Sequence, residues 1–264
     1  MTNIFVGFTT MISGGAIGAA LLFTLFNISG DHVRIVYGTY TVPHGTVHYR
    51  ACIPKKLEEG KAYPSLFLAP GLTIQFQNWM PHCTLLAERN YVAMMIDRPG
   101  SKYDEWLTEV EEGIELLKSM PFTDDDRVDA MGSSFGFQSI SYYALRHPNE
   151  IQGYINDSGY NNPWVMQDSL AKVDTPALVL SGGGEYQENV KDCDRDGFSW
   201  TTAFTEKLRT ENPDALWKRM AYDETTWGCT RHGFLWSPDL PATKNAIHQI
   251  LDFLEATVGN GPAL

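Results

Sequence analysis

Short apolar runs alternate with amphipathic stretches along most of the chain. A short apolar run between turn residues is typical of a buried strand, and apolar residues three or four positions apart are typical of a helix. This pattern predicts strands at 33–40, 46–53, 63–69, 91–97, 127–131, 151–156, 176–180 and 216–222. It predicts helices at 82–90, 106–120, 135–146, 201–210 and 242–258. Alternation of strands and helices indicates an α/β fold, with a mostly parallel sheet covered by helices on both faces.

The first two strands differ from the others. Residues 33–40 and 46–53 alternate apolar and polar side chains, and Pro43-His44-Gly45 lies between them. This pattern predicts two antiparallel strands at one edge of the sheet. No internal repeat or linker follows, so residues 32–264 are expected to form one domain.

The N-terminal segment, residues 1–31, is a separate apolar stretch. Its first 30 residues carry no charged side chain, and Ile4 to Leu25 is long enough to cross a bilayer as a helix. Thr9 and Ser13 dilute the stretch, and no basic cluster flanks it to orient it. A membrane anchor and a helix packed on the domain or in a homodimer contact therefore both stay open. The localisation stays open accordingly, between membrane-associated and cytoplasmic.

The candidate chemistry is centred on Gly132-Ser133-Ser134-Phe135-Gly136, which fits the pattern G-x-S-x-G between a predicted strand and a predicted helix. In that context the central serine occupies a strained turn that exposes its hydroxyl above the carboxyl ends of the strands. Ser134 is therefore the candidate nucleophile. A serine hydroxyl needs a nearby base, and the base needs a carboxylate that orients it.

The loops at the carboxyl ends of parallel strands converge on one crevice, so the partners of Ser134 are expected there, in the chain order serine, acid, histidine. His232 follows the last strand and is the candidate base. Glu185 follows the strand at 176–180 by a glycine-rich turn and is the candidate acid. Other carboxylates at strand ends or in the next loop remain alternatives: Asp157, Asp192, Asp194 and Asp196.

Acyl transfer also requires N–H donors for the developing oxyanion. The expected donors are the main-chain amides of Phe135, after the nucleophile, and of Leu72, after the strand at 63–69. The Gln75 side chain is expected to assist.

Aromatic residues expected in loops suggest an apolar substrate pocket, with Phe137 adding bulk to its floor. With Gln75, the expected substrate-binding residues are Phe76, Trp79, Trp164 and Trp200.

Charge and cysteine content narrow the possible partners. The net charge of −12 argues against binding to a nucleic-acid backbone. The four cysteines form no C-x-x-C pair, so neither a zinc site nor a redox motif is indicated. Cys193 and Cys229 lie in two loops that can meet near the site; two free thiols are favoured there over a disulfide. No phosphate-binding loop is present, and neither a cofactor nor a metal ion is expected.

These motifs together resemble the α/β-hydrolase superfamily, over about residues 33 to 258. The resemblance rests on the elbow at 132–136 and on the segments that follow three strands, at 69–71, 96–100 and 182–185. Within the superfamily the elbow and the late histidine look like the dienelactone-hydrolase-like branch. The resemblance implies an eight-stranded, mostly parallel sheet and a Ser-acid-His triad. Dienelactone hydrolase itself uses a cysteine nucleophile, so Ser134 favours esterase or acylhydrolase chemistry.

The expected function is therefore that of a serine hydrolase, which cleaves a carboxylic ester, thioester or lactone of an apolar small molecule through an acyl-enzyme. One alternative keeps the triad in an acyltransferase, a cyclase or a lyase. Another is a non-catalytic ligand-binding protein on a hydrolase scaffold. The sequence leaves the identity of the substrate open.

Overall fold

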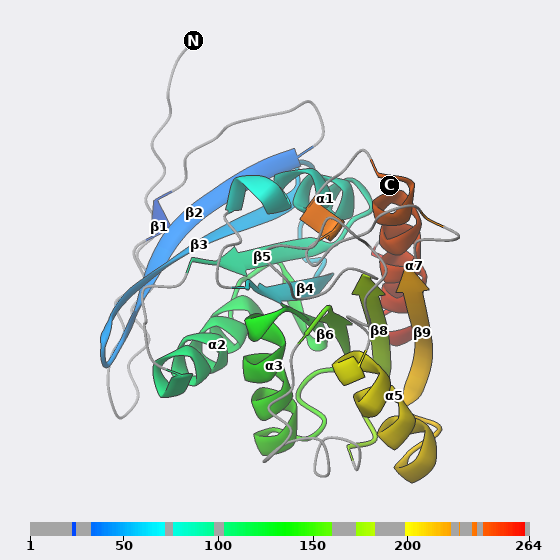
Figure 1. Ribbon diagram of the computed structural model, residues 1–264. Coiled ribbons are helices and arrows are strands. Elements are labelled where there is room, and N and C mark those ends of the chain that lie inside the picture. The colour runs from blue at the N-terminus through cyan, green and yellow to red at the C-terminus, as the bar shows by residue number, and fades with distance from the viewer. Residues whose placement is uncertain are drawn as a thin grey trace.

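The computed structural model describes residues 23–24, 33–71, 76–97, 103–159, 173–182, 199–222, 227, 234–236 and 240–261. Within these ranges nine strands form a single sheet in the order β1-β2-β3-β5-β4-β6-β7-β8-β9 (Figure 1). The strands are β1 Phe23–Thr24, β2 Val33–Val42, β3 Gly45–Pro54, β4 Tyr63–Ala69, β5 Val92–Ile96, β6 Thr123–Ser133, β7 Gly153–Asp157, β8 Ala177–Gly182 and β9 Leu216–Tyr222.

The sheet is antiparallel at its N-terminal edge and parallel elsewhere. β2 pairs antiparallel with β3 around a turn at Pro43 and His44, and β3 pairs antiparallel with β5. All neighbouring pairs from β5 to β9 are parallel. The predicted eight-stranded, mostly parallel sheet is therefore confirmed, and the two-residue strand β1 adds to its edge.

Strand β1 bears on the interpretation of the N-terminal segment. Phe23 pairs with Gly38 and Thr24 pairs with Tyr37, so these two residues are extended. The prediction of a helix running to Leu25 is thus wrong at this end, because the open edge of β2 offers backbone hydrogen bonds to the chain. The rest of that predicted helix lies outside the described residues. Among the helices described, none is both long and apolar enough to span a membrane.

Helices cover both faces of the sheet (Figure 1). One face carries α2 (Tyr103–Lys118), α3 (Phe135–Arg146) and α5 (Ser199–Glu211), and the other carries α1 (Phe76–Glu88) and α7 (Pro241–Thr257). A short 3-10 helix, η1 (Phe234–Trp236), precedes α7.

Helix α1 begins at Phe76, six residues before the predicted start at His82. Pro81 lies inside the helix and lacks an N–H, which explains why the sequence favoured a later start. The buried side chains of Phe76, Trp79 and Cys83 follow helical spacing and pack against the sheet. This apolar stripe compensates for the hydrogen bond that proline cannot donate.

Strand β4 shows how the sheet divides the core into two layers. All seven of its residues are buried. Phe67 and Ala69 pack in the cluster with α2, α3 and α5, whereas Leu66 and Leu68 pack in the cluster with α1 and α7. Side chains alternate between the faces of a strand, so a central strand with helices on both sides buries both sets of side chains and is mostly apolar.

A disulfide joins Cys52 on β3 to Cys83 on α1, with their Cα atoms 5.6 Å apart. Both residues are fully buried. The sequence analysis did not predict this bond, because the cysteines are 31 residues apart and come together only when α1 packs on β3. Cys193 and Cys229, for which free thiols were expected, lie outside the described residues.

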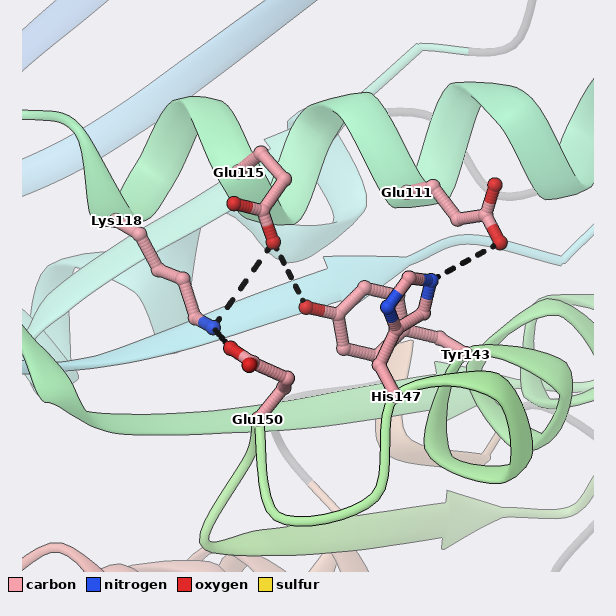
Figure 2. Close-up of polar contacts among 6 residues, drawn as sticks. All are labelled: Glu111, Glu115, Lys118, Tyr143, His147 and Glu150. Atoms are coloured by element: carbon pink, nitrogen blue, oxygen red, sulfur yellow. Dashed lines mark hydrogen bonds and ion pairs between the residues drawn. The ribbon is translucent and has the colours of Figure 1, made fainter.

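A polar network fixes α3 against α2 (Figure 2). The Tyr143 hydroxyl donates to Glu115 Oε1 at 3.0 Å, and its ring stacks on His147 at 4.7 Å between centroids. His147 in turn lies 3.4 Å from Glu111, and Lys118 pairs with Glu150. Burial and the nearby Glu115 carboxylate raise the pKa of Tyr143 well above its ordinary value, so it stays a donor at physiological pH. These contacts hold the end of α3 that is distant from Ser134.

Replacing Asp129 by Asn is expected to change the pH dependence of stability. Burial raises the pKa of this fully buried carboxyl on β6 to about 8, from an ordinary value of 3.8. Between about pH 4 and pH 8 the native state keeps a proton that the unfolded chain releases, so the free energy of unfolding falls as the pH rises. Asn cannot ionise, yet it can still accept a hydrogen bond from Thr257, the partner of Asp129.

Urea unfolding at pH 4 and pH 8 should therefore show that Asp129→Asn is more stable than the wild type at pH 8, with a smaller difference at pH 4. Asp126→Asn changes an exposed carboxyl on the same strand and controls for net charge. An unchanged slope of stability against pH would show that the buried Asp129 is not neutral.

Removing the disulfide with the double substitution Cys52→Ala and Cys83→Ala is expected to destabilise the fold. The bond closes a loop of 31 residues, for which chain entropy predicts a loss of about 3–4 kcal/mol. The free energy of unfolding of both proteins, measured without reductant, checks this. Equal stability of the two proteins, or free Cys52 and Cys83 thiols in the purified wild type, would contradict it.

Candidate active site

The candidate nucleophile Ser134 lies where β6 ends and α3 begins. Its backbone adopts φ 52° and ψ −121°, a left-handed conformation that a residue with a side chain rarely takes. Ser134 is the N-cap residue of α3, but its side chain makes no capping hydrogen bond. The strained turn predicted from G-x-S-x-G is thus present, and the hydroxyl is not used to cap the helix.

Two glycines make this turn possible. A Cβ atom on Gly132 would lie 2.2 Å from the Phe137 Cα, and one on Gly136 would lie 1.9 Å from the Ala69 carbonyl oxygen. No side chain fits at such distances, so both positions require glycine. The close approach at Gly136 also brings the end of β4 against the first turn of α3. Those are the two segments from which the oxyanion donors were expected.

The predicted oxyanion donors lie on these segments. Phe135 is the first residue of α3, and its half-buried ring packs edge-on against Trp106 at 5.2 Å between centroids. The other expected donor, Leu72, follows the end of β4 and lies outside the described residues, as does Gln75. Their roles remain predictions.

A carboxylate from the next strand lies directly beside the elbow. Asp157 ends β7, in register with Ser133. The Ser133 hydroxyl donates to Asp157 Oδ2 at 2.6 Å, and the Ser134 amide donates to the Asp157 carbonyl at 2.9 Å. Asp157 is fully buried, and burial raises the pKa of its carboxyl to about 7, against the opposing effect of the Ser133 hydrogen bond.

The predicted base and acid, His232 and Glu185, lie outside the described residues. The strand before His232, β9, ends at Tyr222 as predicted, and the strand before Glu185, β8, ends at Gly182, two residues later than predicted. Both strands run parallel to β6, so their carboxyl ends are on the same edge of the sheet as Ser134. The topology therefore allows the predicted triad, while the geometry of His232 and Glu185 stays a prediction.

Tyr222 contacts Trp227 and Phe234, which lie on either side of His232 in the sequence. Its ring packs against Trp227 at 5.4 Å and against Phe234 at 4.8 Å between centroids. Its hydroxyl donates to Asn245 Oδ1 on α7 at 3.0 Å. Tyr222 at the end of β9 thus contacts the residues that come directly before and after 228–233 in the sequence. The sequence analysis treated Tyr222 only as a strand residue and missed this contact.

His82 makes a second connection near this segment. The ring is buried on α1, and its Nε2 is hydrogen-bonded to the Leu235 carbonyl of η1. Burial lowers the pKa of His82, which favours the neutral ring. The sequence assigned His82 to the start of a helix; it lies in the middle of α1, where it links this helix to the residues that follow His232.

Some residues predicted to line the pocket occupy other elements than expected. Phe76 and Trp79 were assigned to a loop, but they lie on α1 with both side chains buried. Trp200 lies within α5, and Trp164 is outside the described residues. Phe137 is fully buried between Tyr154 and Phe204, so it belongs to the core rather than to a pocket floor. Contact of the other aromatic residues with a substrate remains a prediction.

One group of potential metal ligands is found within the described ranges. It consists of Asp124, Asp125 and Asp126, whose carboxylate atoms lie within 4.8 Å of one another. They lie at the start of β6, at the opposite end of the strand from Ser133, and Asp124 pairs with Arg127 at 2.7 Å. This group therefore has no part in the chemistry of Ser134.

Comparison with known proteins gives few sequence matches. No family model matches the chain. An alignment of 132 positions shows 26% identity to dipeptidyl-peptidase 5 of Porphyromonas gingivalis. The match includes 42% of this chain and 19% of the peptidase, so the relative is much longer than the matched part.

Solved structures give a clearer result. A candidate dienelactone hydrolase from Klebsiella pneumoniae superposes with a TM-score of 0.60 at 14% identity, over 83% of this chain and 98% of that one. Thermogutta terrifontis esterase 2, in a form phosphorylated by paraoxon, superposes with a TM-score of 0.65 at 13% identity, over 86% of this chain and 96% of that one. The chain has the α/β-hydrolase fold, as the sequence predicted.

Two substitutions of Tyr222 are expected to differ strongly in stability. Tyr222→Phe keeps the ring contacts and loses one hydrogen bond, which costs about 1 kcal/mol. Tyr222→Ala also removes the packing against Trp227 and Phe234, which costs about 3–5 kcal/mol. Trypsin is expected to cleave after Arg231 faster in Tyr222→Ala than in Tyr222→Phe. Unfolding in urea and mapping of the tryptic fragments measure both effects; equal losses would show that the ring contacts contribute little.

Proposed function

We propose that this protein is a serine hydrolase that cleaves a carboxylic ester, thioester or lactone of an apolar small molecule. The observation that carries the proposal is the left-handed backbone of Ser134 at the junction of β6 and α3. Strained backbone conformations of this kind persist where the surrounding structure enforces them, and they cluster at active sites. The α/β-hydrolase fold and the G-x-S-x-G sequence agree with it.

In the proposed reaction, His232 accepts the proton of the Ser134 hydroxyl while its oxygen attacks the carbonyl carbon of the substrate. The C–O or C–S bond to the leaving group then breaks, and His232 returns the proton to the departing alcohol or thiol. Water, deprotonated by His232, then attacks the acyl carbonyl carbon. The C–O bond to Ser134 breaks, the acid leaves, and His232 returns the proton to the Ser134 oxygen. Glu185 accepts a hydrogen bond from His232 and orients its ring.

The main-chain amides of Phe135 and Leu72 stabilise the oxyanion in both steps. Such donors are fixed before the reaction and face the position where charge develops, so they lower the barrier without rearrangement. The close approach of Gly136 to Ala69 supports this assignment, since it brings together the two segments that carry the donors.

A peptidase is the second candidate function. Part of the chain is similar to dipeptidyl-peptidase 5, and the same set of residues can attack an amide carbonyl. In that case His232 delivers the proton to a leaving amine instead of an alcohol. Parallel assays with p-nitrophenyl esters and with dipeptide p-nitroanilides separate the two functions.

A fluorophosphonate probe is expected to label the wild-type protein at Ser134, because it reacts with activated serines. Ser134→Ala is expected to abolish labelling and ester cleavage. Glu185→Gln is expected to lower kcat by about 10²–10⁴, since the base loses the carboxylate that orients it. Peptide mapping by mass spectrometry identifies the labelled residue, and p-nitrophenyl acetate and octanoate report ester cleavage and preference for chain length.

Ser141→Ala removes another buried hydroxyl of α3 and serves as the control, with labelling expected at the wild-type rate. A folded wild-type protein that is not labelled would overturn the proposal and favour a ligand-binding protein. Labelling without ester or amide hydrolysis would favour an acyltransferase or a cyclase.

A further inference from the structure

The elbow is attached to the neighbouring strand by a pair of hydrogen bonds that involves both the side chain and the main chain of one residue. Asp157 Oδ2 accepts from the Ser133 hydroxyl at 2.6 Å, and the Asp157 carbonyl accepts from the Ser134 amide at 2.9 Å. The main-chain bond can be made by any residue at this position. The side-chain bond requires both a hydroxyl at 133 and an acceptor at 157.

Burying the Ser133 hydroxyl and the Asp157 carboxyl costs solvation free energy, so the arrangement is expected to have a role that offsets this cost. Ser133 is 1% exposed and Asp157 is 0% exposed. Burial raises the pKa of the Asp157 carboxyl, against the opposing effect of the Ser133 hydrogen bond, and this carboxyl adds to the effect of burial in raising the pKa of Tyr222. A buried carboxyl normally lowers stability unless its hydrogen bonds offset the loss of solvation.

The strand end that carries Asp157 is also strained. Ser158, the next residue, has φ 51°, close to the φ of 52° at Ser134. Its amide donates to the Leu180 carbonyl at 2.9 Å, and the Gly159 amide donates to the Asn156 side chain at 2.6 Å. The end of β7 is therefore fixed by its neighbours, so that Asp157 offers its carboxyl to the elbow from a rigid support.

We propose that Asp157 is a positioning residue, which acts through Ser133 to hold the Ser134 hydroxyl in the attacking orientation. The inference rests on the proposed function, since it concerns the same nucleophile. The Ser133–Asp157 hydrogen bond lies on one side of the strained residue and the first turn of α3 lies on the other. Without the bond, the backbone at 133 and 134 can relax toward an unstrained conformation and move the nucleophile away from the substrate. An error of about 1 Å in such a position can lower the rate about 100-fold.

The role as positioning residue differs from that of the acid that orients His232. A triad acid needs its negative charge, because it stabilises the protonated histidine. A positioning residue needs only an acceptor for the Ser133 hydroxyl, and an amide oxygen provides one. Asp157→Asn therefore separates the two roles.

The experiment measures the fluorophosphonate labelling rate at Ser134 and the kcat and KM for p-nitrophenyl butyrate. Ser133→Ala and Asp157→Ala are each expected to lower the labelling rate and kcat about 10- to 100-fold, with KM within about twofold of the wild type. Asp157→Asn is expected to restore most of the rate. The double alanine variant is expected to be no slower than the single ones, because both remove the same bond. Ser141→Ala is the matched control for the loss of a buried serine hydroxyl on the adjoining helix.

Each outcome decides a separate question. Absence of labelling in the folded wild type overturns the proposed function and this inference with it. If the wild type reacts and Ser133→Ala reacts at the same rate, the positioning role alone is overturned. Ser133→Ala is a small change in the side chain, so it provides the test if Asp157→Ala does not fold. A rate in Asp157→Asn as low as in Asp157→Ala would show that the charge is required, which contradicts positioning and favours Asp157 as the triad acid.

Discussion

The structure depends on the junction between β6 and α3, where the positions of Gly132 and Gly136 have no room for a side chain. Where β6 turns into α3, the backbone at Gly136 lies against the Ala69 carbonyl of β4, so that even one Cβ atom would overlap with it. Three segments from different parts of the sequence meet there: the end of β4, the end of β6 and the start of α3. Their contact forces Ser134 into a conformation that it would not adopt in a free peptide. The apolar layers above and below the sheet supply the stability that offsets this local strain.

The central strands and the helix after the elbow could be predicted from the sequence because their signals are local. The apolar run of β4 and the alternation in β2 and β3 require no knowledge of distant residues. The bounds of α3, Phe135 to Arg146, agree with the prediction, since glycines mark its start and the apolar spacing marks its length. The candidate nucleophile could be recognised for the same reason.

Features that depend on distant contacts were missed. Helix α1 begins at Phe76 because its aromatic stripe packs on β3 and β5, which outweighs the effect of Pro81 on local propensity. The hydrogen bond between Ser133 and Asp157 joins adjacent strands 24 residues apart, and the contacts of Tyr222 with Trp227 and Phe234 appear only in the folded chain. The aromatic residues of α1 and Phe137 looked like pocket residues, because residue type alone does not distinguish a cavity wall from the core.

The disulfide between β3 and α1 has a consequence for the conditions in which the protein folds. Its sulfur atoms are completely shielded from solvent, so neither an oxidant nor a reductant can reach them while α1 is packed on the sheet. The bond must therefore form before α1 packs or during a local opening of the chain. Two preparations of the same sequence, one folded in a reducing cytosol and one in an oxidising compartment, would then differ in a covalent bond that later exposure to air or to glutathione changes only slowly. Expression conditions thus determine which of the two molecules an assay measures.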